Sequence, residues 1–401
     1  MPMTASHPRI RPVSTGTGVE IHRAGWVMAT PQTLFRDGFV AVENGVIREV
    51  GHGRPTLSGP VTDHGPGTLM PGLINAHTHL ELSALHGRLS LENGFQDWVR
   101  QLLITRESLG HEALVRGAES GISALRESGC VGVGEISTLG LTRDMLHVSG
   151  LSGVWFREYL GSELPADLRL RPETGECCSD ALAGHAPHTT GPKLLRALRA
   201  ATSAAGLPFS LHLDESADEV EFLTTGKGAW ADFLTRRGID FSDWGLPVKS
   251  PVLYAARMGI LDRRTLVVHL IHARKGEFEV LKAHQVSVCL CPRSNSNLHN
   301  ALPDLPGMLA AGLAPCVGTD SLASADSLSL FDEIRFTAGA FPSVSPATLL
   351  GMATLNGARA LGLADRFGTL TPGKRGKFIY IPVTASGPST LSEAIIHESS
   401  A

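Results

Sequence analysis

Short apolar runs alternate with amphipathic stretches along most of the chain after Pro71. Eight runs have the length and residue content of buried strands, and they span residues 68–76, 131–136, 154–159, 181–186, 209–213, 266–270, 286–290 and 315–318. Segments such as 95–109, 191–205 and 328–339 lie between them and have the periodicity of amphipathic helices. Repeated strand–helix units build parallel sheets covered by helices. Eight of them within roughly 300 residues predict an α/β fold with a TIM-type (β/α)8 barrel.

The two ends of the chain have a different pattern. Residues 18–51 alternate apolar and polar side chains, and the alternation breaks at Asn44-Gly45, which is a strong signal for a β-hairpin. Near the other end, the apolar run 378–383 predicts a further strand. We therefore predict that the barrel is inserted in a small β-sandwich domain built from both termini. The predicted boundaries are 1–67 and 368–401 for the small domain and 68–367 for the barrel.

Charge and hydropathy narrow the choice of partners. The formal net charge is -4, and acidic and basic residues are interspersed. Without a basic stripe we expect no nucleic-acid partner. No apolar run of about 18 residues occurs, and residues 1–17 lack the apolar stretch of a secretory signal, so we expect no membrane association and a cytoplasmic protein. A small-molecule substrate is the expected partner, and a homo-oligomer is compatible with the sequence.

The cysteines show no spacing typical of a disulfide framework. The chain has six cysteines, among them the adjacent pair Cys177 and Cys178, and we predict free thiols. Cys289 and Cys291 alternate along an apolar strand, so we favour packing over the alternative that they are soft metal ligands.

Three histidines and an aspartate stand at the ends of predicted strands. His77 and His79 follow the first strand, His212 ends the fifth, and Asp320 follows the last. Barrel enzymes carry reactive groups at the carboxyl ends of their strands, and residues two apart on a strand face the same side. A histidine met alone would more often be a hydrogen-bonded core residue. Together, however, the four residues predict an open catalytic site for one divalent metal ion, with Zn²⁺ preferred and Fe²⁺ kept as the alternative.

Several motifs resemble those of the amidohydrolase superfamily. They are the segment 71–83 with its sequence PGLINAHTHLELS, and the segments 212–216, 291–295, 318–324, 356–363 and 368–374. The pattern is similar to the mononuclear aminohydrolase branch, which holds deaminases and triazine chlorohydrolases. Segment 183–189 lacks the lysine that bridges two metals in other branches, and Lys193 falls in a predicted helix. Glu215 stands three residues after His212, which resembles the ligand and proton-carrying glutamate of these deaminases.

The resemblance implies a metal-dependent hydrolytic deaminase with three catalytic residues. Asp320 would bind the metal and accept a proton from water, and His269 would orient that water. Glu215 would carry protons to the ring nitrogen and to the leaving amine, a role that calls for a carboxyl with a raised pKa. The alternative for Glu215 is an ordinary surface carboxylate.

Within this branch the sequence is most similar to aminofutalosine deaminases. These enzymes convert 6-amino-6-deoxyfutalosine to futalosine in menaquinone biosynthesis, so an amino-purine nucleoside-like substrate is implied. The implied substrate-binding residues are His185, Glu81, Arg293, Ser324 and Glu107. Glu107 fits a solvated helix position as well, and Arg293 could equally brace its loop. The alternatives are an S-adenosylhomocysteine- or guanine-type deaminase, a triazine-type chlorohydrolase and a catalytically silent scaffold relative.

Overall fold

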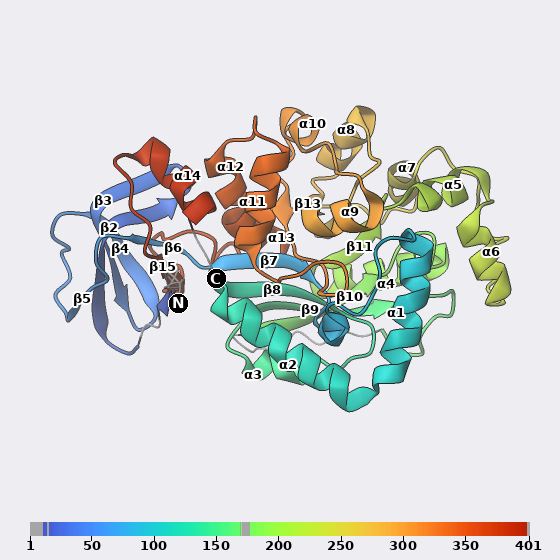
Figure 1. Cartoon of the computed structure of the whole chain (residues 1–401), viewed down its shortest axis with the longest axis horizontal. Helices are drawn as coiled ribbons and strands as arrows, with labels where there is room; N and C mark the ends of the chain where they lie inside the picture. Colours follow the sequence, from blue (N-terminus) through green and yellow to red (C-terminus); the bar gives the residue numbers. More distant parts are fainter. Residues whose placement is uncertain (1–10, 14–15, 169, 171–176, 399–401) are drawn as a thin grey trace, which may run out of the picture.

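The chain forms a barrel and a smaller β-sheet domain that lie side by side (Figure 1). The computed structural model describes residues 11–13, 16–168, 170 and 177–398. A barrel of parallel strands with helices between them, together with a separate and mostly antiparallel sheet, confirms the predicted fold class. The outer limits of the predicted small domain, residues 1 and 401, lie outside the described residues. The boundaries between the domains stay predictions.

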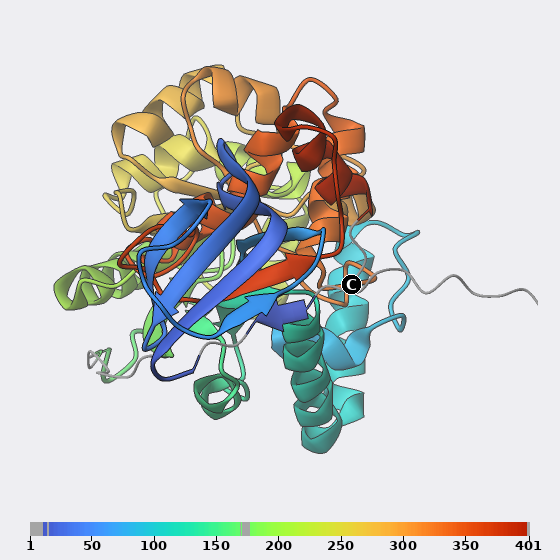
Figure 2. The same ribbon diagram turned by 90° about the vertical axis from the view of Figure 1, so that its left-hand side faces the viewer.

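Both ends of the chain contribute to one seven-stranded sheet, in the order β1-β15-β6-β2-β3-β4 with β5 beside β2 (Figure 2). Its strands are β1 (Arg11–Val13), β2 (Val19–Thr30), β3 (Thr33–Glu43), β4 (Val46–His52), β5 (Val61–Asp63), β6 (Thr68–Pro71) and β15 (Phe378–Ile381). β15 runs antiparallel between β1 and β6. The predicted strand at 378–383 therefore forms, and it joins the two ends of the chain in one sheet.

The predicted hairpin is confirmed. Glu43 at the end of β3 pairs with Val46 at the start of β4, so the connecting loop is Asn44-Gly45. Both loop residues have positive φ, 52° for Asn44 and 74° for Gly45. A two-residue turn between right-twisted strands needs this left-handed backbone, which asparagine and glycine adopt at low cost.

Eight parallel strands form the barrel sheet, in the order β14-β13-β12-β11-β10-β9-β8-β7. They are β7 (Leu73–Thr78), β8 (Cys130–Ser137), β9 (Ser152–Tyr159), β10 (Cys178–Gly184), β11 (Phe209–Leu213), β12 (Thr265–His269), β13 (Ser287–Leu290) and β14 (Cys316–Val317). The first and last strands meet where Thr319 donates its backbone N–H to the carbonyl of His77 at 3.0 Å. Gly318 permits this approach, because a Cβ there would lie 2.5 Å from the same oxygen.

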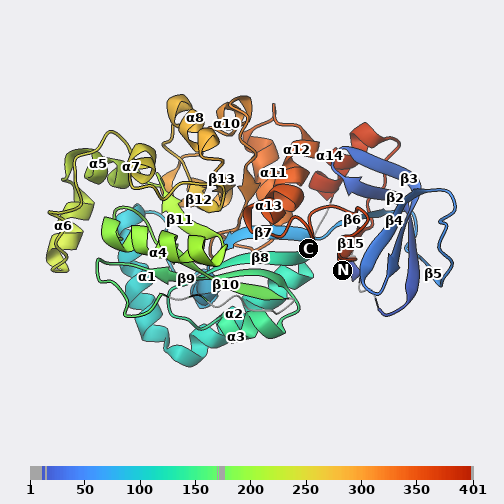
Figure 3. The same cartoon turned by 180° about the vertical axis from the view of Figure 1, so that it is seen from behind.

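Helices surround the barrel and cover its outer face (Figure 3). They are α1 (Phe95–Leu109), α2 (His111–Glu127), α3 (Arg143–Val148), α4 (Pro192–Ala205), α5 (Ala217–Thr225), α6 (Ala229–Arg236), α7 (Pro251–Arg257), α8 (Lys275–Ala283), α9 (Pro292–His299), α10 (Leu305–Ala310), α11 (Leu330–Ala340), α12 (Pro346–Gly351), α13 (Gly357–Ala360) and α14 (Pro388–Glu398), with the 3₁₀ helix η1 (Leu80–Leu85) and the π-helix η2 (Met352–Asn356). In the described part of the chain, none of them has the length and apolar character that crossing a bilayer requires.

Two features differ from the sequence expectation. The predicted strand 68–76 is divided at Gly72, because β6 pairs with β15 in the small sheet whereas β7 pairs with β8 in the barrel. The tail also ends in α14, which we did not expect. Its buried Leu391 and Ile395 belong to the same apolar core as α11 and α12, and this packing accounts for the helix.

The cysteines are free thiols, as predicted. Cys289, Cys291 and Cys316 lie in an apolar cluster with Leu266 and Val268. Among the described residues, none of the side-chain groups with metal-binding geometry contains a cysteine. These three thiols therefore contribute to packing.

Candidate metal centre and active site

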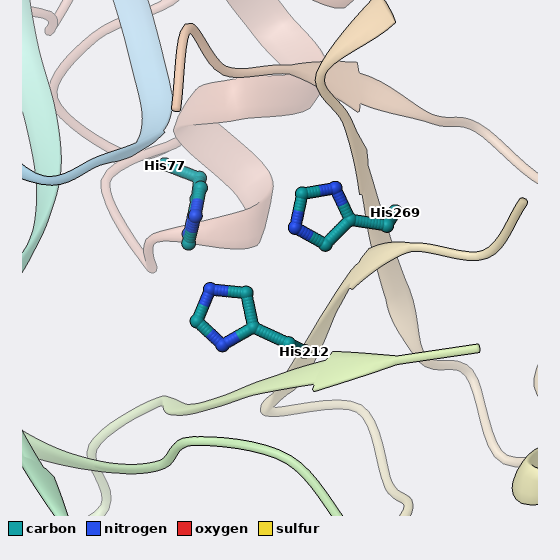
Figure 4. Close-up of side chains that lie close together, drawn as sticks. All are labelled: His77, His212 and His269. Carbon is teal, nitrogen blue, oxygen red and sulfur yellow. The ribbon is translucent and has the colours of Figure 1, made fainter. Parts of the chain in front are cut away.

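The predicted metal ligands converge at the carboxyl ends of barrel strands. His77 lies near the end of β7 and His79 directly after it, His212 is the last residue but one of β11, and Asp320 follows β14. His269 ends β12 and points at the same spot, as Figure 4 shows for the rings of His77, His212 and His269. Residues far apart in the chain thus meet because neighbouring parallel strands end at one face of the barrel.

The distances are those of a compact group of nitrogen and oxygen donors. Nε2 of His79 lies 3.3 Å from Nε2 of His212. Oδ1 of Asp320 lies 3.8 Å from Nε2 of His77 and 3.6 Å from Nε2 of His79. The donor atoms of His77, His212 and His269 also lie within 4.8 Å of one another. This donor set is that of a divalent-metal site.

His77 provides the sharpest test of whether a cation fits. Its side chain has no exposed surface, and neither ring nitrogen has a hydrogen-bond partner. A buried polar atom without a partner costs free energy, and a metal ion would satisfy it. Burial lowers the pKa of His77 well below its usual value and that of His79 to about 3. Both rings are therefore neutral and keep a lone pair for a cation.

Hydrogen bonds to the atoms that do not face the cluster fix the orientation of His212 and Asp320. Nδ1 of His212 donates to the carbonyl of His185 at 2.7 Å, which leaves the lone pair on Nε2 facing the cluster. Oδ2 of Asp320 accepts from Oγ of Ser294 at 2.5 Å and from Oγ of Ser324 at 3.0 Å. Its Oδ1 is left to face the imidazoles. Such partners are what fix the geometry of metal ligands.

The backbone at this face departs from ordinary strand geometry. Asp214, His269 and Asp320 have φ of 58°, 78° and 54°. Residues other than glycine adopt this left-handed region at a cost, and such residues gather at functional sites. Here the turn directs the chain away from each strand end while the side chain of His269 or Asp320 stays at the cluster.

Glu215 lies beside the cluster, in the loop between β11 and α5. Its Oε1 is 3.7 Å from Nε2 of His269 and 3.2 Å from Nε2 of His299. Burial raises the pKa of Glu215, but the two imidazoles outweigh burial and hold that pKa well below its usual value. We expected a raised pKa, and the difference arises because the imidazoles of His269 and His299 flank the carboxylate. Glu215 in this arrangement is ionised and can accept a proton.

A cavity of ≈ 340 Å³ adjoins this cluster. We call its polar end the cavity floor, which consists of His79, His212, Glu215, His269 and Asp320. Most of the remaining lining is apolar, and we call this part the apolar wall, which includes Leu82, Phe95, Trp98, Leu102, Trp230 and Phe233. A pocket with a few convergent polar groups and an otherwise apolar lining is typical of a site for a small organic ligand.

A family comparison decides which class of protein carries this site. The profile of the Amidohydrolase family matches residues 68–394. The chain belongs to the amidohydrolase family. The resemblance seen in its motifs is thereby confirmed, and the amidohydrolase is a hydrolase that acts on carbon–nitrogen bonds.

Individual relatives are similar to this amidohydrolase over most of its length. It is 29% identical over 344 residues to the 5-methylthioadenosine/S-adenosylhomocysteine deaminase of Moorella thermoacetica, a match covering 80% of this chain and 74% of the relative. It is 28% identical over 313 residues to the aminodeoxyfutalosine deaminase of Deinococcus radiodurans, 73% of each chain. The structure of Helicobacter pylori aminofutalosine deaminase in complex with methylthio-coformycin gives a TM-score of 0.83 at 25% identity, covering 95% of this chain and 97% of that one.

Two of the substrate-binding residues predicted for the amidohydrolase lie at or next to the cavity. His185 lines it, and its Nδ1 is 2.6 Å from Oγ1 of Thr189. Ser324 is buried behind the cavity floor, where it donates to Asp320. Burial lowers the pKa of His185 to about 4, so the ring is neutral and its Nε2 can exchange a hydrogen bond with a ligand.

The other three predicted residues do not line this cavity. Glu81 is buried, and protein donors bind its carboxylate. Arg293 forms an ion pair with Asp326 and donates to Oγ of Ser327 at 3.0 Å. Glu107 lies at an adjoining hollow, which shares Val99, Leu103, Phe233 and Arg237 with the cavity. Their roles in substrate binding stay predictions, and for Arg293 the contacts support the alternative of a loop brace.

The amidohydrolase also contains site residues that our sequence reasoning assigned no role. His299 contacts Glu215, and Asn295 holds Nδ1 of His269 through its Oδ1 at 2.8 Å. Residues 295 and 299 are one helical turn apart on α9, a spacing that places two side chains on the same face. That spacing was the available signal. Glu158 lines the cavity as well, and its place near the carboxyl end of the predicted strand 154–159 was the available signal.

Proposed function

We propose that this amidohydrolase is a metal-dependent hydrolytic deaminase of an amino-purine nucleoside-like substrate. The observation that carries the proposal is the position of Glu215, 3.7 Å from His269 and next to the group of metal-binding side chains, in a cavity whose lining is mostly apolar. A flat apolar ring fits against the wall, and its amino-bearing carbon then faces the cavity floor. Water is the second reactant, and ammonia leaves.

The residues divide the chemistry between them. One divalent ion held by His77, His79, His212 and Asp320 would supply a water of lowered pKa, and Zn²⁺ is our first choice with Fe²⁺ second. Asp320, whose Oδ2 is held by Ser294 and Ser324, would accept a proton from the water. His269 orients the attacking oxygen. Glu215, which is ionised at the start, would take up one proton of the water and pass it to the ring nitrogen. The second water proton, accepted by Asp320, would reach the amine through Glu215, so that the C–N bond breaks, ammonia leaves and the C=O bond forms.

The relatives support the substrate class. Their names describe deaminases of 5-methylthioadenosine, S-adenosylhomocysteine and aminodeoxyfutalosine. Conversion of 6-amino-6-deoxyfutalosine to futalosine is the specific reaction that we propose. The cavity volume of ≈ 340 Å³ and its mostly apolar lining are compatible with a small organic substrate of this class.

An ammonia-release assay tests the proposal. Zinc- and iron-loaded protein is incubated with aminodeoxyfutalosine, 5′-methylthioadenosine, S-adenosylhomocysteine, guanine and a chlorotriazine. We expect ammonia from the adenosine-type nucleosides. Turnover of the chlorotriazine alone would contradict the proposal, and no turnover of any compound by either metal form would favour a catalytically silent relative.

Glu215→Gln tests the proton carrier within the same assay. The amide cannot take up the proton, so we expect kcat to fall by a factor of about 10² to 10⁴ while the bound metal is retained. Glu279→Gln is the matched control, because Glu279 is an exposed residue of α8 outside the cavity. Unchanged turnover in Glu215→Gln would remove the proposed role.

A further inference from the structure

We propose that Glu158 is a specificity-determining residue that accepts a hydrogen bond from an O–H or N–H group of the substrate. The proposal rests on the proposed function, because it concerns the substrate of the same cavity. Glu158 is the last residue but one of β9, at the carboxyl end of that strand. It lines the cavity together with Thr138 and His185, next to the metal-binding group.

One oxygen of Glu158 has a protein partner and the other has none. Oγ1 of Thr138 donates to Oε2 at 2.7 Å, which fixes the orientation of the carboxylate. Oε1 is buried and has no hydrogen-bond partner. A buried carboxylate oxygen without a donor is costly, so its presence at a cavity points to a donor on the ligand.

His212 does not donate a hydrogen bond to Oε1 of Glu158. Its Nδ1 lies 3.7 Å from Oε1 of Glu158, beyond hydrogen-bond distance. The single hydrogen on Nδ1 already goes to the carbonyl of His185 at 2.7 Å. Glu158 is therefore not the group that orients this metal ligand, and its free oxygen is available to a substrate.

Two nearby buried carboxylates show what a purely structural role looks like. Glu135 accepts from the backbone N–H of Leu80 and from Oγ1 of Thr142, both at 3.0 Å. Oε1 of Glu81 accepts from Oγ of Ser137 at 2.5 Å, and its Oε2 accepts from the backbone N–H of Leu139 at 2.7 Å. In both residues each oxygen has a donor, and neither residue lines the cavity. Glu158 differs on both points.

The free oxygen also defines the chemistry of the ligand. Among the described residues that line the cavity, the only other carboxylates are Glu215 and Asp320, which already have roles in the reaction. Glu107, one of the implied substrate-binding residues, lines an adjoining hollow and not this cavity. Besides the amino group that reacts, the donors that an amino-purine compound can offer to Glu158 are a sugar hydroxyl of a nucleoside and the ring N9–H of a free base.

Steady-state kinetics of Glu158→Gln and Glu158→Asp test this proposal. Adenosine, 2′-deoxyadenosine, 3′-deoxyadenosine, adenine and 9-methyladenine are the probes, and Glu135→Gln is the matched buried control. We expect KM of the substrate with the matching donor to rise about tenfold in Glu158→Gln, with kcat and metal content nearly unchanged. Removing that donor from the substrate should abolish the difference between wild type and variant. If the KM difference between wild type and variant disappears only with a deoxy nucleoside, the donor is a sugar hydroxyl. If it disappears only with 9-methyladenine, the donor is the ring N–H.

Three outcomes would overturn the proposal. One is an unchanged KM for every probe in both variants, and another is the same KM increase in Glu135→Gln. The third is loss of bound metal in Glu158→Gln, because a residue that supports His212 would act through the metal. If the wild type releases no ammonia from any probe, the proposed function fails separately. Calorimetric binding of methylthio-coformycin to wild type and Glu158→Gln then decides the role of Glu158, and equal affinity would contradict it.

Discussion

The cavity floor and the apolar wall are built in different ways. The floor residues stand at the ends of barrel strands, and buried partners such as Ser294 and Asn295 fix the side chains of Asp320 and His269. Much of the wall comes from helices, with Phe95, Trp98 and Leu102 on α1 and Trp230 on α6. Apolar contact without directional hydrogen bonds holds most of these side chains in place.

This difference suggests that the floor carries out the reaction, whereas the wall discriminates between substrates. A strand end in a closed sheet can hold a ligand atom within a fraction of an ångström, which bond making requires. An apolar wall discriminates by shape, and a single methylene in such a wall changes discrimination by about 1 to 3 kcal/mol. We therefore expect floor variants to lose metal and rate, whereas wall variants change affinity and substrate preference.

The largest effect is expected for Asp320→Asn, which tests the floor. The amide is a poorer ligand than the carboxylate and cannot accept the proton from water. Because even outer partners of metal ligands change metal affinity by about 10- to 100-fold, we expect a larger loss here and a fall in kcat/KM of about a thousandfold or more. Metal content by mass spectrometry and ammonia release are the measurements.

Asp326→Asn is the control for that variant. Asp326 lies six residues away, and its side chain is 82% exposed. It should keep both metal and activity. A metal-replete Asp320→Asn enzyme with near-normal kcat would show that the floor does not work as described.

A smaller effect is expected for Leu102→Ala, which tests the wall. The substitution removes apolar surface from the cavity without touching a floor residue, so KM should rise about tenfold while metal content and kcat change little. Ile104→Ala is the matched control, because Ile104 lies on the same helix but is 56% exposed and does not line this cavity. Equal effects in the two variants, or metal loss in Leu102→Ala, would break the distinction between floor and wall.

The sequence predicted the floor far better than the wall, for a physical reason. The floor residues His79, His212, His269 and Asp320 all follow apolar runs, and the carboxyl ends of barrel strands all lie at the same face of the barrel. A predicted helix does not reveal which of its side chains face the cavity, because consecutive residues point about 100° apart. We predicted α1 with its bounds, yet Glu107 faces a surface hollow while its neighbour Arg106 lines the cavity.

Glu158 and the tail teach the same lesson. Strand β9 was predicted, but its residues do not reveal that Oε1 of Glu158 lacks a hydrogen-bond donor. The missing donor depends on the hydrogen bond that His212 makes with the carbonyl of His185. Helix α14 depends on apolar contacts with helices distant in the chain. The local sequence pattern predicts neither the missing hydrogen-bond donor of Glu158 nor the packing of α14.

The smallest effect on activity is expected behind the floor, at Glu333 of α11, where the change is in stability. This buried carboxylate accepts from the backbone N–H of Arg293 at 3.2 Å, and its Oε1 lies 3.6 Å from Nη1 of the same residue. Burial raises the pKa of Glu333 to about 8, although the Arg293 guanidinium opposes the shift. The folded state therefore binds the proton more tightly than the unfolded state does, so the contribution of Glu333 to stability is full at low pH and is lost as the pH rises toward 8.

Replacing Glu333 with Gln removes this titration while keeping the shape of the side chain. Relative to Glu333→Gln, the wild type should lose stability between about pH 5 and pH 8, by up to roughly 1 kcal/mol per pH unit. Urea unfolding of both proteins at pH 5.5, 6.5, 7.5 and 8.5 measures the difference. Parallel stability curves would mean that Glu333 is ionised in the folded protein at every pH tested. Because Glu333 lies outside the cavity, metal content and KM at pH 7 should stay at wild-type values in the variant, and a change in either would show that the floor depends on α11 as well as on the strands.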